Sequence, residues 1–508
     1  MSNKIINISS LSSKIKKIKG KRKVVLCHGV FDVLHIGHIN HFKSAKKKGD
    51  ILVVSVTPDR YVNKGPNRPV FPLNIRMQSI AALKDVDFVT ANISDTAIYP
   101  ISNLKPDFYC KGKDYLDNKA DVSGNIQKEL RAIKSIGGKI HYTQDELYSS
   151  SKIINNLGLN LKDDQKNFIK HLKKEKNVNI INTIKAINSF SDLKVLIIGE
   201  TIIDEYVYCD ALGKSGKEPV LVVKKLNSKK FIGGTLAIAN NLSSFCKKIS
   251  VISYIGEKKE ELGFIKKNIR KNIKLSFLNK KNSCTIVKKR YVDEVNKTKV
   301  LGVYSIEDNY LNTKEEKLLK KNIIKEINKH DLVIISDYGH GLISKKIAKE
   351  ILKRAKFSSV NAQVNAANIG HHTISKYLKP NLAIINENEM RHEMRNKSEK
   401  LDVLIKSISK KINSNYTAVT SGNTGMKMFS MKSKKLHHCP AFAKNIVDKI
   451  GAGDTMLALL SLCVFKKLNS KLSMFISSLA AATNVQTEAN SLILDKTSII
   501  KSAESYLK

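Results

Sequence analysis

Residues 24–38 read VVLCHGVFDVLHIGH, and this stretch predicts the fold of the first part of the chain. The apolar run 24–27 is typical of a buried strand, Gly29 indicates a turn, and a helical pattern begins near Gly37. Another apolar run at 51–56 follows that helix. Because strand and helix alternate in this way, the sequence predicts a parallel, doubly wound α/β sheet.

A second α/β region follows. Two of its apolar runs end in polar residues at Asp337 and Asn386, which is where an open α/β sheet places its ligand contacts. Residues 156–192 are rich in Lys and Asn and show no clear strand, so they indicate a helical linker. The sequence therefore predicts one domain at 1–155 and another at 193–508.

The charge is strongly positive but does not point to nucleic acid. The chain has 508 residues, of which 89 are Lys or Arg and 45 are Asp or Glu, so its formal net charge is +44. Only ten of the basic residues are Arg, and Lys is spread over the whole chain. A nucleic-acid surface more often uses a localised patch rich in Arg. We expect no specific nucleic-acid partner, although such a field attracts anionic substrates.

The cysteine pattern and the apolar runs bear on location. The seven Cys residues form no CxxC pair, which argues against structural zinc and a disulfide framework and fits a reducing, cytoplasmic setting. Residues 1–20 are polar and lack the apolar core of a secretory signal. The longest apolar run, 456–465, is too short to span a bilayer, so we expect no membrane partner.

A candidate phosphate site lies where the first α/β helix begins. A helix N-terminus presents unpaired N–H groups and partial positive charge, and both favour phosphate. His35 and His38 are three residues apart, so both can face one phosphate group, and Gly37 lets the backbone approach closely. A strand, a turn, two His and a Gly in this order predict a nucleotide-phosphate site.

The first domain resembles the nucleotidyltransferases that carry an HxGH sequence, here at 35–38, and the resemblance implies a Rossmann-like, cytidylyltransferase-like domain. The resemblance continues in family order through KGPNRPV at 64–70, Arg76, KGKDY at 111–115 and YSSSKII at 148–154. It implies that His35 and His38 contact the triphosphate in the transition state. It also implies nucleotide or phosphate contacts from Gly29, Phe31, Gly37, Lys64, Arg76, Lys111 and Ser150.

The letters HIGH at 35–38 are also typical of class I aminoacyl-tRNA synthetases. MKSK at 431–434 loosely matches the second signature of those enzymes. That match lies inside the second α/β region, however, and the first domain is small for a synthetase core with its insertions. A tRNA- or RNA-linked protein therefore stays a remote alternative.

The most specific pattern of the second region is NIVDKIGAGDT at 445–455. Gly451, Ala452 and Gly453 open a helix, and the glycines let successive N–H groups converge on a phosphoryl oxygen. Asp454 follows directly and is placed to take a proton from an attacking hydroxyl. The pattern predicts phosphoryl transfer with Asp454 as the catalytic base.

Residues 193–508 resemble the ribokinase-like sugar kinases, whose α/β domain carries a small β lid. The resemblance rests on GETIID at 199–204, on paired Gly and Asn residues within 233–241, on NENE at 386–389 and on TSGNTG at 420–425. It implies sugar contacts from Asp204, Gly233, Gly234 and Asn240. It implies nucleotide contacts from Thr420, Gly422, Gly425, Asn484 and the 451–453 turn, and indirect magnesium binding by Asn386 and Glu389.

Two further sequences, KEPV at 217–220 and SDYGHG at 336–341, are similar to one subgroup, the bifunctional heptose-phosphate kinases and nucleotidyltransferases. That subgroup usually has the kinase half first, so the order is reversed here. The chain departs from the subgroup at His340, where Lys is usual, and at Ile450, where Thr is usual. In 361–368, amides replace a charged pair. These departures bear on the identity of the sugar more than on the reaction.

Together the resemblances imply a bifunctional enzyme that makes nucleotide-activated sugars, as used at cell surfaces. One domain would phosphorylate a sugar or sugar phosphate with ATP and Mg²⁺. The other would join a sugar 1-phosphate to a nucleotide from ATP or CTP and release pyrophosphate. A homodimer through the kinase domain is also expected. The alternative is a kinase fused to a cytidylyltransferase for a non-sugar alcohol phosphate.

Overall fold

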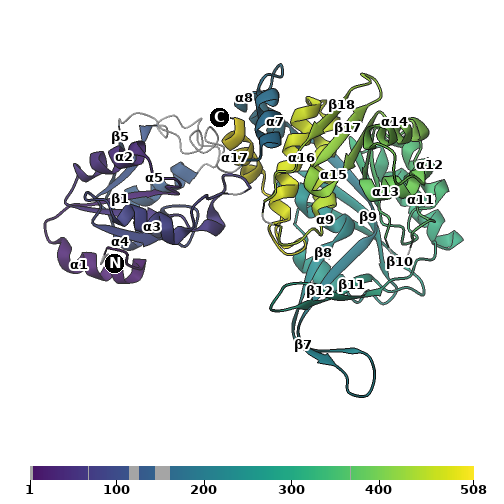
Figure 1. Cartoon of the computed structure of the whole chain (residues 1–508), viewed down its shortest axis with the longest axis horizontal. Helices are drawn as coiled ribbons and strands as arrows, with labels where there is room; N and C mark the ends of the chain where they lie inside the picture. The colour runs from purple at the N-terminus through teal and green to yellow at the C-terminus, as the bar shows by residue number, and fades with distance from the viewer. Residues whose placement is uncertain are drawn as a thin grey trace. The chain divides into compact units, whose positions relative to one another are not determined.

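The computed structural model describes residues 4–66, 68–113, 125–143, 161–365, 368–444 and 446–507. Its contacts divide the chain into two compact units (Figure 1). The first consists of Met1–Ile169 and Thr497–Lys508, and the second of Lys170–Lys496. Among the described residues, no helix combines the length and the apolar character needed to cross a membrane.

The first unit is built on a parallel five-stranded sheet in the order β3-β2-β1-β4-β5. The order reverses between β1 and β4, and such a reversal opens a crevice at the carboxyl ends of the two strands. The strands are β1 (Val24–Gly29), β2 (Ile51–Val56), β3 (Phe88–Ala91), β4 (Phe108–Gly112) and β5 (Lys139–Thr143). The helices are α1 (Ile8–Lys19), α2 (Ile36–Lys46), η1 (Asp59–Tyr61), α3 (Leu73–Ala81), α4 (Ile98–Leu104) and α5 (Asn125–Ser135).

Both faces of this sheet are buried, which explains why β1 and β2 read as continuous apolar runs. Val25 and Leu52 pack in one hydrophobic cluster, and their neighbours Val24 and Val53 pack in another. Successive side chains of a strand point to opposite faces, so each strand supplies both clusters.

The second unit contains a nine-stranded sheet in the order β10-β9-β6-β13-β14-β15-β16-β17-β18. The strands from β10 to β16 are parallel, and β17 and β18 add antiparallel to the edge. They are β6 (Lys194–Gly199), β9 (Lys248–Gly256), β10 (Ile273–Lys280), β13 (Leu332–Asp337), β14 (Ser358–Ala362), β15 (Leu382–Asn386), β16 (Tyr416–Thr420), β17 (Met426–Ser430) and β18 (Leu436–Cys439).

Helices cover this sheet, and α15 packs between α9 and α16. The helices of this unit are α8 (Ile180–Asn188), α9 (Gly234–Leu242), α10 (Leu262–Asn268), α11 (Thr313–Ile327), α12 (Lys345–Arg354), α13 (Glu387–Met394), α14 (Leu401–Ile412), α15 (Ala452–Phe465) and α16 (Ser470–Asn484). Two more helices, α7 (Asp163–Lys173) and α17 (Lys496–Leu507), cross the limits between the two units. Short 3₁₀ turns are η4 (Ser189–Asp192), η5 (Ile374–Lys376) and η6 (Gly422–Thr424).

A separate four-stranded sheet, in the order β12-β11-β7-β8, forms the predicted small lid. Its strands are β7 (Thr201–Lys214), β8 (Leu221–Gly233), β11 (Ile286–Asp293) and β12 (Lys299–Ser305). Figure 1 shows the hairpin of β7 and β8 projecting beyond the rest of its unit. The first half of β7 is buried and its far end is exposed, so the lid is anchored at one end only.

The limits of the compact units differ from the predicted domain limits at two points. The predicted linker contains α7 and α8, and from Lys170 onward it belongs to the second unit. An ion pair of 2.6 Å between Glu175 and Lys471 helps to hold this segment to that unit. The last helix, α17, belongs from Thr497 onward to the first unit.

Candidate active sites

The HxGH residues lie at the start of α2, directly after β1. His35 is the N-cap of that helix, and its Nδ1 accepts a hydrogen bond of 3.1 Å from the Gly37 amide. The His35 and His38 rings stack with their centroids 3.9 Å apart. The Phe31 ring meets the His38 ring edge-on at 5.4 Å. The structure therefore brings together four of the residues that the sequence assigned to the first site.

Both imidazoles are neutral near pH 7. Burial, reinforced by the charges of His35 and Lys64, lowers the pKa of His38 to about 3. Burial and the Lys64 ammonium also lower the pKa of His35. Lys64 must lie near both rings to act on them, so a cation and two imidazoles share one place at a helix N-terminus. This combination suits an anionic ligand.

Arg76, which the resemblance assigns to phosphate, is buried in this structure. Its side chain serves the protein backbone and stabilises the loops around the site. The guanidinium donates to the carbonyls of Phe71, Val30 and Thr57 at 2.9, 2.5 and 2.9 Å and to Asp59 Oδ1 at 2.5 Å.

Lys111 is held at the end of β4 by Glu129, with 3.4 Å between Nζ and Oε2. Glu129 also accepts hydrogen bonds of 2.8 Å from the Ala97 amide and the Tyr109 hydroxyl. The backbone of Gly29 at the end of β1 is overlain by the Phe31 ring, which would contact a Cβ there at 3.0 Å. Ser150 lies outside the residues that the structure describes.

The second site centres on the first turn of α15. Gly451 has φ +85°, and a Cβ there would lie 2.0 Å from Asn490 Oδ1, so only glycine fits. The Cβ side of Gly453 is open, with no atom within 4 Å. The backbone of Ala452 and Gly453 thus begins the helix where a phosphoryl group can approach its N–H groups.

Asp448 anchors the loop that leads to this turn. Its carboxylate accepts hydrogen bonds of 3.1 Å from the amides of Ile450 and Ala489. It also accepts from the Tyr206 hydroxyl at 2.5 Å and pairs with Lys299 at 2.6 Å, and both of those residues lie on lid strands. The lid and the glycine turn are therefore tied together by one carboxylate.

Asp454 follows the glycine turn and accepts a hydrogen bond of 2.6 Å from the Tyr338 hydroxyl at Oδ1. Burial is the main cause that raises the pKa of Asp454 to about 7. The Tyr338 hydrogen bond and the Lys288 charge act against this rise, and the charge of Asp204 adds to it. A carboxyl whose pKa lies near the working pH is suited to proton transfer. The interaction with Asp204 shows that the two predicted residues belong to one site.

Asp204 lies on lid strand β7 and pairs with Arg290 of β11 at 2.5 Å. A Cβ on Gly233 would lie 2.4 Å from Asp204 Oδ2, so the missing side chain makes room for this carboxylate. Gly234 has φ +54° and begins α9. The absence of a Cβ at Gly233 therefore leaves space for the Asp204 carboxylate, and glycine at 234 allows the positive φ at the start of the helix.

Asn240, which the resemblance assigns to the sugar, has protein partners in this structure. It is buried in α9, where its Nδ2 donates to Asn268 O at 3.1 Å and its Oδ1 accepts from the Arg270 amide at 3.2 Å. Its neighbour Asn241 donates to Thr455 Oγ1 at 3.1 Å. Both amides hold loops and helices together in this conformation.

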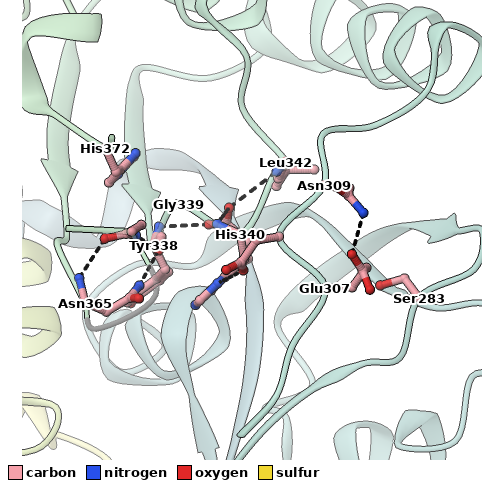
Figure 2. A network of polar contacts seen from close by, with 12 residues as sticks. Ser283, Glu307, Asn309, Tyr338, Gly339, His340, Leu342, Asn365 and His372 are labelled. Atoms are coloured by element: carbon pink, nitrogen blue, oxygen red, sulfur yellow. Dashed lines mark hydrogen bonds and ion pairs between the residues drawn. The ribbon is translucent and has the colours of Figure 1, made fainter. Parts of the chain in front are cut away.

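The buried Glu200 carboxylate orders the SDYGHG loop, of which Figure 2 labels Tyr338, Gly339 and His340. The Glu200 side chain accepts hydrogen bonds from the amides of Tyr338, His340 and Leu342 at 2.9, 3.2 and 3.4 Å. Burial and the neighbouring Asp337 raise the pKa of Glu200 to about 7. By fixing this loop, Glu200 fixes the Tyr338 hydroxyl that contacts Asp454.

The residues that depart from the subgroup pattern lie around the same loop. His340 is buried, and its Nδ1 lies 2.6 Å from Asp308 Oδ1. Burial and the Lys288 charge lower its pKa. In Figure 2, Asn365 reaches the Tyr338 carbonyl, with Nδ2 at 2.8 Å, and Asn368 donates to the same carbonyl at 2.9 Å. The amides that replace the charged pair therefore support the Tyr338 loop.

The predicted nucleotide turn joins β16 to β17. Gly425 has φ +97°, and a Cβ there would lie 2.1 Å from Cys439 O, so only glycine fits. Gly422, with φ +54°, opens the η6 turn after Thr420. Asn484 is fully buried at the end of α16, yet neither polar atom of its amide has a partner among the described residues. An unpartnered buried amide suits a bound nucleotide.

Asn386 and Glu389 form a capping box at the start of α13. Asn386 Oδ1 accepts from the Glu389 amide at 2.8 Å, and Glu389 Oε2 accepts from the Asn386 amide at 2.9 Å. Burial raises the pKa of Glu389 to about 7. These oxygens already accept backbone N–H groups, so they fit magnesium held through water rather than direct ligands. No cluster of three His, Cys, Asp or Glu residues suited to a metal exists in the described part of the chain.

Three contributors to the second site were not singled out from the sequence. They are Tyr338 and Glu200 beside Asp454, and Lys288 on lid strand β11, which is buried and acts electrostatically on Asp454. Glu200 lies within GETIID at 199–204 and Tyr338 within SDYGHG at 336–341, so the resemblance to sugar kinases could have indicated both residues. Lys288 follows no pattern, because strand pairing across the lid brings it to the site.

A model of the pfkB family of carbohydrate kinases matches residues 192–496, which is more than half of the chain. The chain belongs to the pfkB carbohydrate kinase family. A cytidylyltransferase-like model matches residues 26–156. The predicted pairing of a Rossmann-like nucleotidyltransferase domain with a ribokinase-like kinase domain, in that order, is confirmed.

Several curated proteins that this pfkB family member matches carry the name bifunctional protein HldE. The bifunctional protein HldE of Campylobacter fetus is 41% identical over 134 residues, which are 26% of this chain and 29% of that protein. The protein of the same name from Campylobacter jejuni strain RM1221 is 27% identical over 282 residues, 54% of this chain and 57% of that protein. The matched segments span less than two thirds of either relative.

Solved structures match the kinase fold. A mutant of phosphofructokinase-2 from Escherichia coli aligns with a TM-score of 0.51 and 13% identity, covering 62% of this chain and 99% of that one. A ribokinase-type protein from Agrobacterium tumefaciens aligns with a TM-score of 0.50 and 14% identity, covering 62% and 99%. At these identities the likeness shows the fold alone.

Proposed function

We propose that the chain is a bifunctional enzyme of nucleotide-sugar synthesis. Its pfkB domain would phosphorylate a heptose-like sugar or sugar phosphate with ATP, and its first domain would convert a sugar 1-phosphate to a nucleotide sugar. The observation that carries the proposal is the meeting of Asp454, the 451–453 turn and Asp204 in one site, in a chain that also carries stacked His35 and His38.

In the kinase site, the acceptor hydroxyl oxygen attacks the γ-phosphorus of ATP, and the bond from that phosphorus to ADP breaks. The hydroxyl proton passes to the Asp454 carboxylate, which Tyr338 orients through its 2.6 Å hydrogen bond. The N–H groups of the glycine turn receive the charge of the migrating phosphoryl group. Asp204 is placed to hold the acceptor's hydroxyl groups, since Arg290 fixes its carboxylate.

Magnesium fits this site through water at Asn386 and Glu389, where it would neutralise phosphate charge. Asn484 and the turn at Thr420, Gly422 and Gly425 would contact the nucleotide. These assignments rest on the unpartnered amide of Asn484 and on the glycine turn.

In the first site, an oxygen of the sugar 1-phosphate attacks the α-phosphorus of ATP or CTP, and the bond to pyrophosphate breaks. The attacking oxygen is already ionised, so no general base is needed. His35 and His38 would donate hydrogen bonds to the phosphates, and Lys64 would supply positive charge. Lys111 and the backbone near Gly29, Phe31 and Gly37 would complete the nucleotide contacts, with Ser150 assigned by resemblance alone.

The same chemistry bears on partners and location. ATP and nucleotide substrates suit the cytoplasm. Exposed apolar residues on β8 and β12, among them Leu221 and Leu301, suit a second copy of the chain as the partner of the lid. A cytidylyltransferase for a non-sugar alcohol phosphate is the second candidate, because the first site alone does not distinguish the acceptor.

A screen of acceptors and nucleotides tests the proposal. The full chain is assayed for ADP release with sugars and sugar phosphates, and for pyrophosphate release with ATP or CTP paired with sugar 1-phosphates or glycerol phosphate. We expect ADP release with a heptose-like acceptor and pyrophosphate release with its 1-phosphate. Pyrophosphate release with only the alcohol phosphate would favour the second candidate, and release of neither product would overturn the proposal.

A further inference from the structure

The last helix, α17, lies from Thr497 onward outside both family matches, which end at residues 156 and 496. From Thr497 it belongs nevertheless to the nucleotidyltransferase unit (α17 is labelled in Figure 1). Most of its side chains are buried, namely Ile499, Ile500, Ser502, Ala503, Ser505, Tyr506 and Leu507. So extensive a buried face on a terminal helix needs a structural or functional reason.

One face of α17 packs on the loop of residues 64–71. The Tyr506 hydroxyl donates a buried hydrogen bond of 3.1 Å to the Pro66 carbonyl. Gly65 has φ +99°, and the Cβ that it lacks would lie 3.3 Å from both Ser502 Cβ and the Tyr506 ring. Gly65 therefore lets the helix approach the loop closely.

The other side of the same loop is held by the HxGH segment. Asp32, three residues before His35, accepts hydrogen bonds of 2.8 and 3.1 Å from the amides of Val70 and Phe71. The Arg68 side chain is only 3% exposed, and its Nη1 lies 3.9 Å from Asp32 Oδ2. Both Asp32 and Tyr506 act electrostatically on Arg68, so this guanidinium lies between the helix and the HxGH segment.

Lys64 begins this loop, and its ammonium is close enough to lower the pKa of both His35 and His38. The contacts therefore run from Tyr506 through the loop to the cation that faces the two imidazoles. A loop fixed on two sides keeps such a cation in place before the substrate binds, which lowers the entropic cost of binding.

We propose that α17 is part of the nucleotidyltransferase site and that Tyr506 is a positioning residue, which holds the 64–71 loop and Lys64 for the phosphorylated acceptor. The inference rests on the proposed function. Helix α17 follows the kinase domain in the sequence, yet it completes the nucleotidyltransferase site.

Two variants of the full chain test the inference, Tyr506→Phe and a deletion of residues 497–508. Tyr506→Phe removes one hydrogen bond and keeps the ring. We expect it to raise KM for the sugar 1-phosphate about fivefold, the factor that one ordinary hydrogen bond represents, with kcat little changed. The deletion should lower kcat/KM by about 10² or more through loss of positioning. Lys501→Ala on the same helix is the matched control and should behave as wild type.

Hydrogen exchange of the 64–71 amides gives a readout that does not depend on activity. We expect faster exchange there in the deletion variant, with kinase activity unchanged in all three variants. An unchanged KM in Tyr506→Phe, or a fall in kcat alone, would overturn the positioning role even if the deletion variant misfolds. If the wild-type chain releases no pyrophosphate with any pair of substrates, the proposed function itself fails. Unchanged hydrogen exchange of the 64–71 amides in the deletion variant would separately refute the contact between α17 and this loop.

Discussion

The Tyr338 hydroxyl donates a hydrogen bond to Asp454, with 2.6 Å between the hydroxyl oxygen and Oδ1. These residues are far apart in the sequence and come from the end of β13 and the first turn of α15. Glu200 holds the backbone of Tyr338, and Asn365 and Asn368 hold its carbonyl. The orientation of the proposed base therefore depends on residues that follow three strands of the sheet, β6, β13 and β14, and not on the glycine turn alone.

Replacing Asp454 by Asn tests the base. The amide keeps the shape and can still accept the Tyr338 hydrogen bond, but it cannot take the proton. We expect kcat for ATP-dependent phosphorylation to fall by about 10² or more, with ATP affinity little changed. Pyrophosphate release from a supplied sugar 1-phosphate serves as the internal control and should be unaffected. A variant that phosphorylates at the wild-type rate would exclude Asp454 as the base.

The pKa of Asp454 predicts how activity and stability depend on pH. Its folded-state pKa of about 7 lies above the ordinary value for Asp, so the kinase rate should rise with pH through about 7. For stability the sign is opposite: the folded state holds the proton more tightly, so this contribution is complete below the ordinary pKa and is lost as pH rises through about 7. The Tm of Asp454→Asn should therefore exceed that of the wild type at pH values above about 7, and the two Tm values should converge under acidic conditions. An acid limb near the ordinary pKa of Asp would contradict this.

Replacing His38 by Ala tests the first site. His38 is neutral, so it is expected to donate a hydrogen bond as charge develops on the phosphates, and loss of one such donor commonly costs about 10²–10³ in rate. Pyrophosphate release should fall by that factor while phosphorylation by the kinase domain continues. Pyrophosphate release that persists near the wild-type rate would rule out the HxGH assignment.

Gly233→Ala tests the placement of Asp204. The new Cβ would lie 2.4 Å from Asp204 Oδ2, so the carboxylate must move away from its position beside Arg290. Misplacement of a group by about 1 Å can cost 10² in kcat/KM, and we expect a loss of about that size for the kinase. Gly263→Ala in α10 is the control, because no atom lies within 4 Å of its Cβ. Equal activity of the two variants would refute a role for Asp204 in holding the acceptor.

Much of the fold follows from local patterns. The apolar runs at 24–27 and 51–56 and the run that ends at Asp337 lie in β1, β2 and β13, and Gly451, Gly425 and Gly234 stand where the backbone has a positive φ. These features depend on residues next to each other in the chain, so the pattern of apolar residues and glycines is enough to find them. The stacked pair of His35 and His38 belongs to the same class, because one helical turn brings them together.

Other assignments depended on distant parts of the chain. Arg76 and Asn240 matched family positions, yet their side chains serve backbone groups of neighbouring loops. No local pattern shows whether a buried polar side chain finds its partner in the protein or in a ligand, because the partner is supplied by packing.

The sequence by itself determined the α/β class of both domains and the helix N-termini at Gly37 and Gly451, since each follows from short-range periodicity and from the steric freedom of glycine. The order of the two domains followed from motifs that resemble known families. Only the tertiary structure brought Lys288 and Asp204 of the lid to act on Asp454, and only it packed Tyr506 against Pro66. Such contacts join residues tens to hundreds of positions apart. They form when sheets and helices bury their apolar faces, and that burial depends on the whole fold.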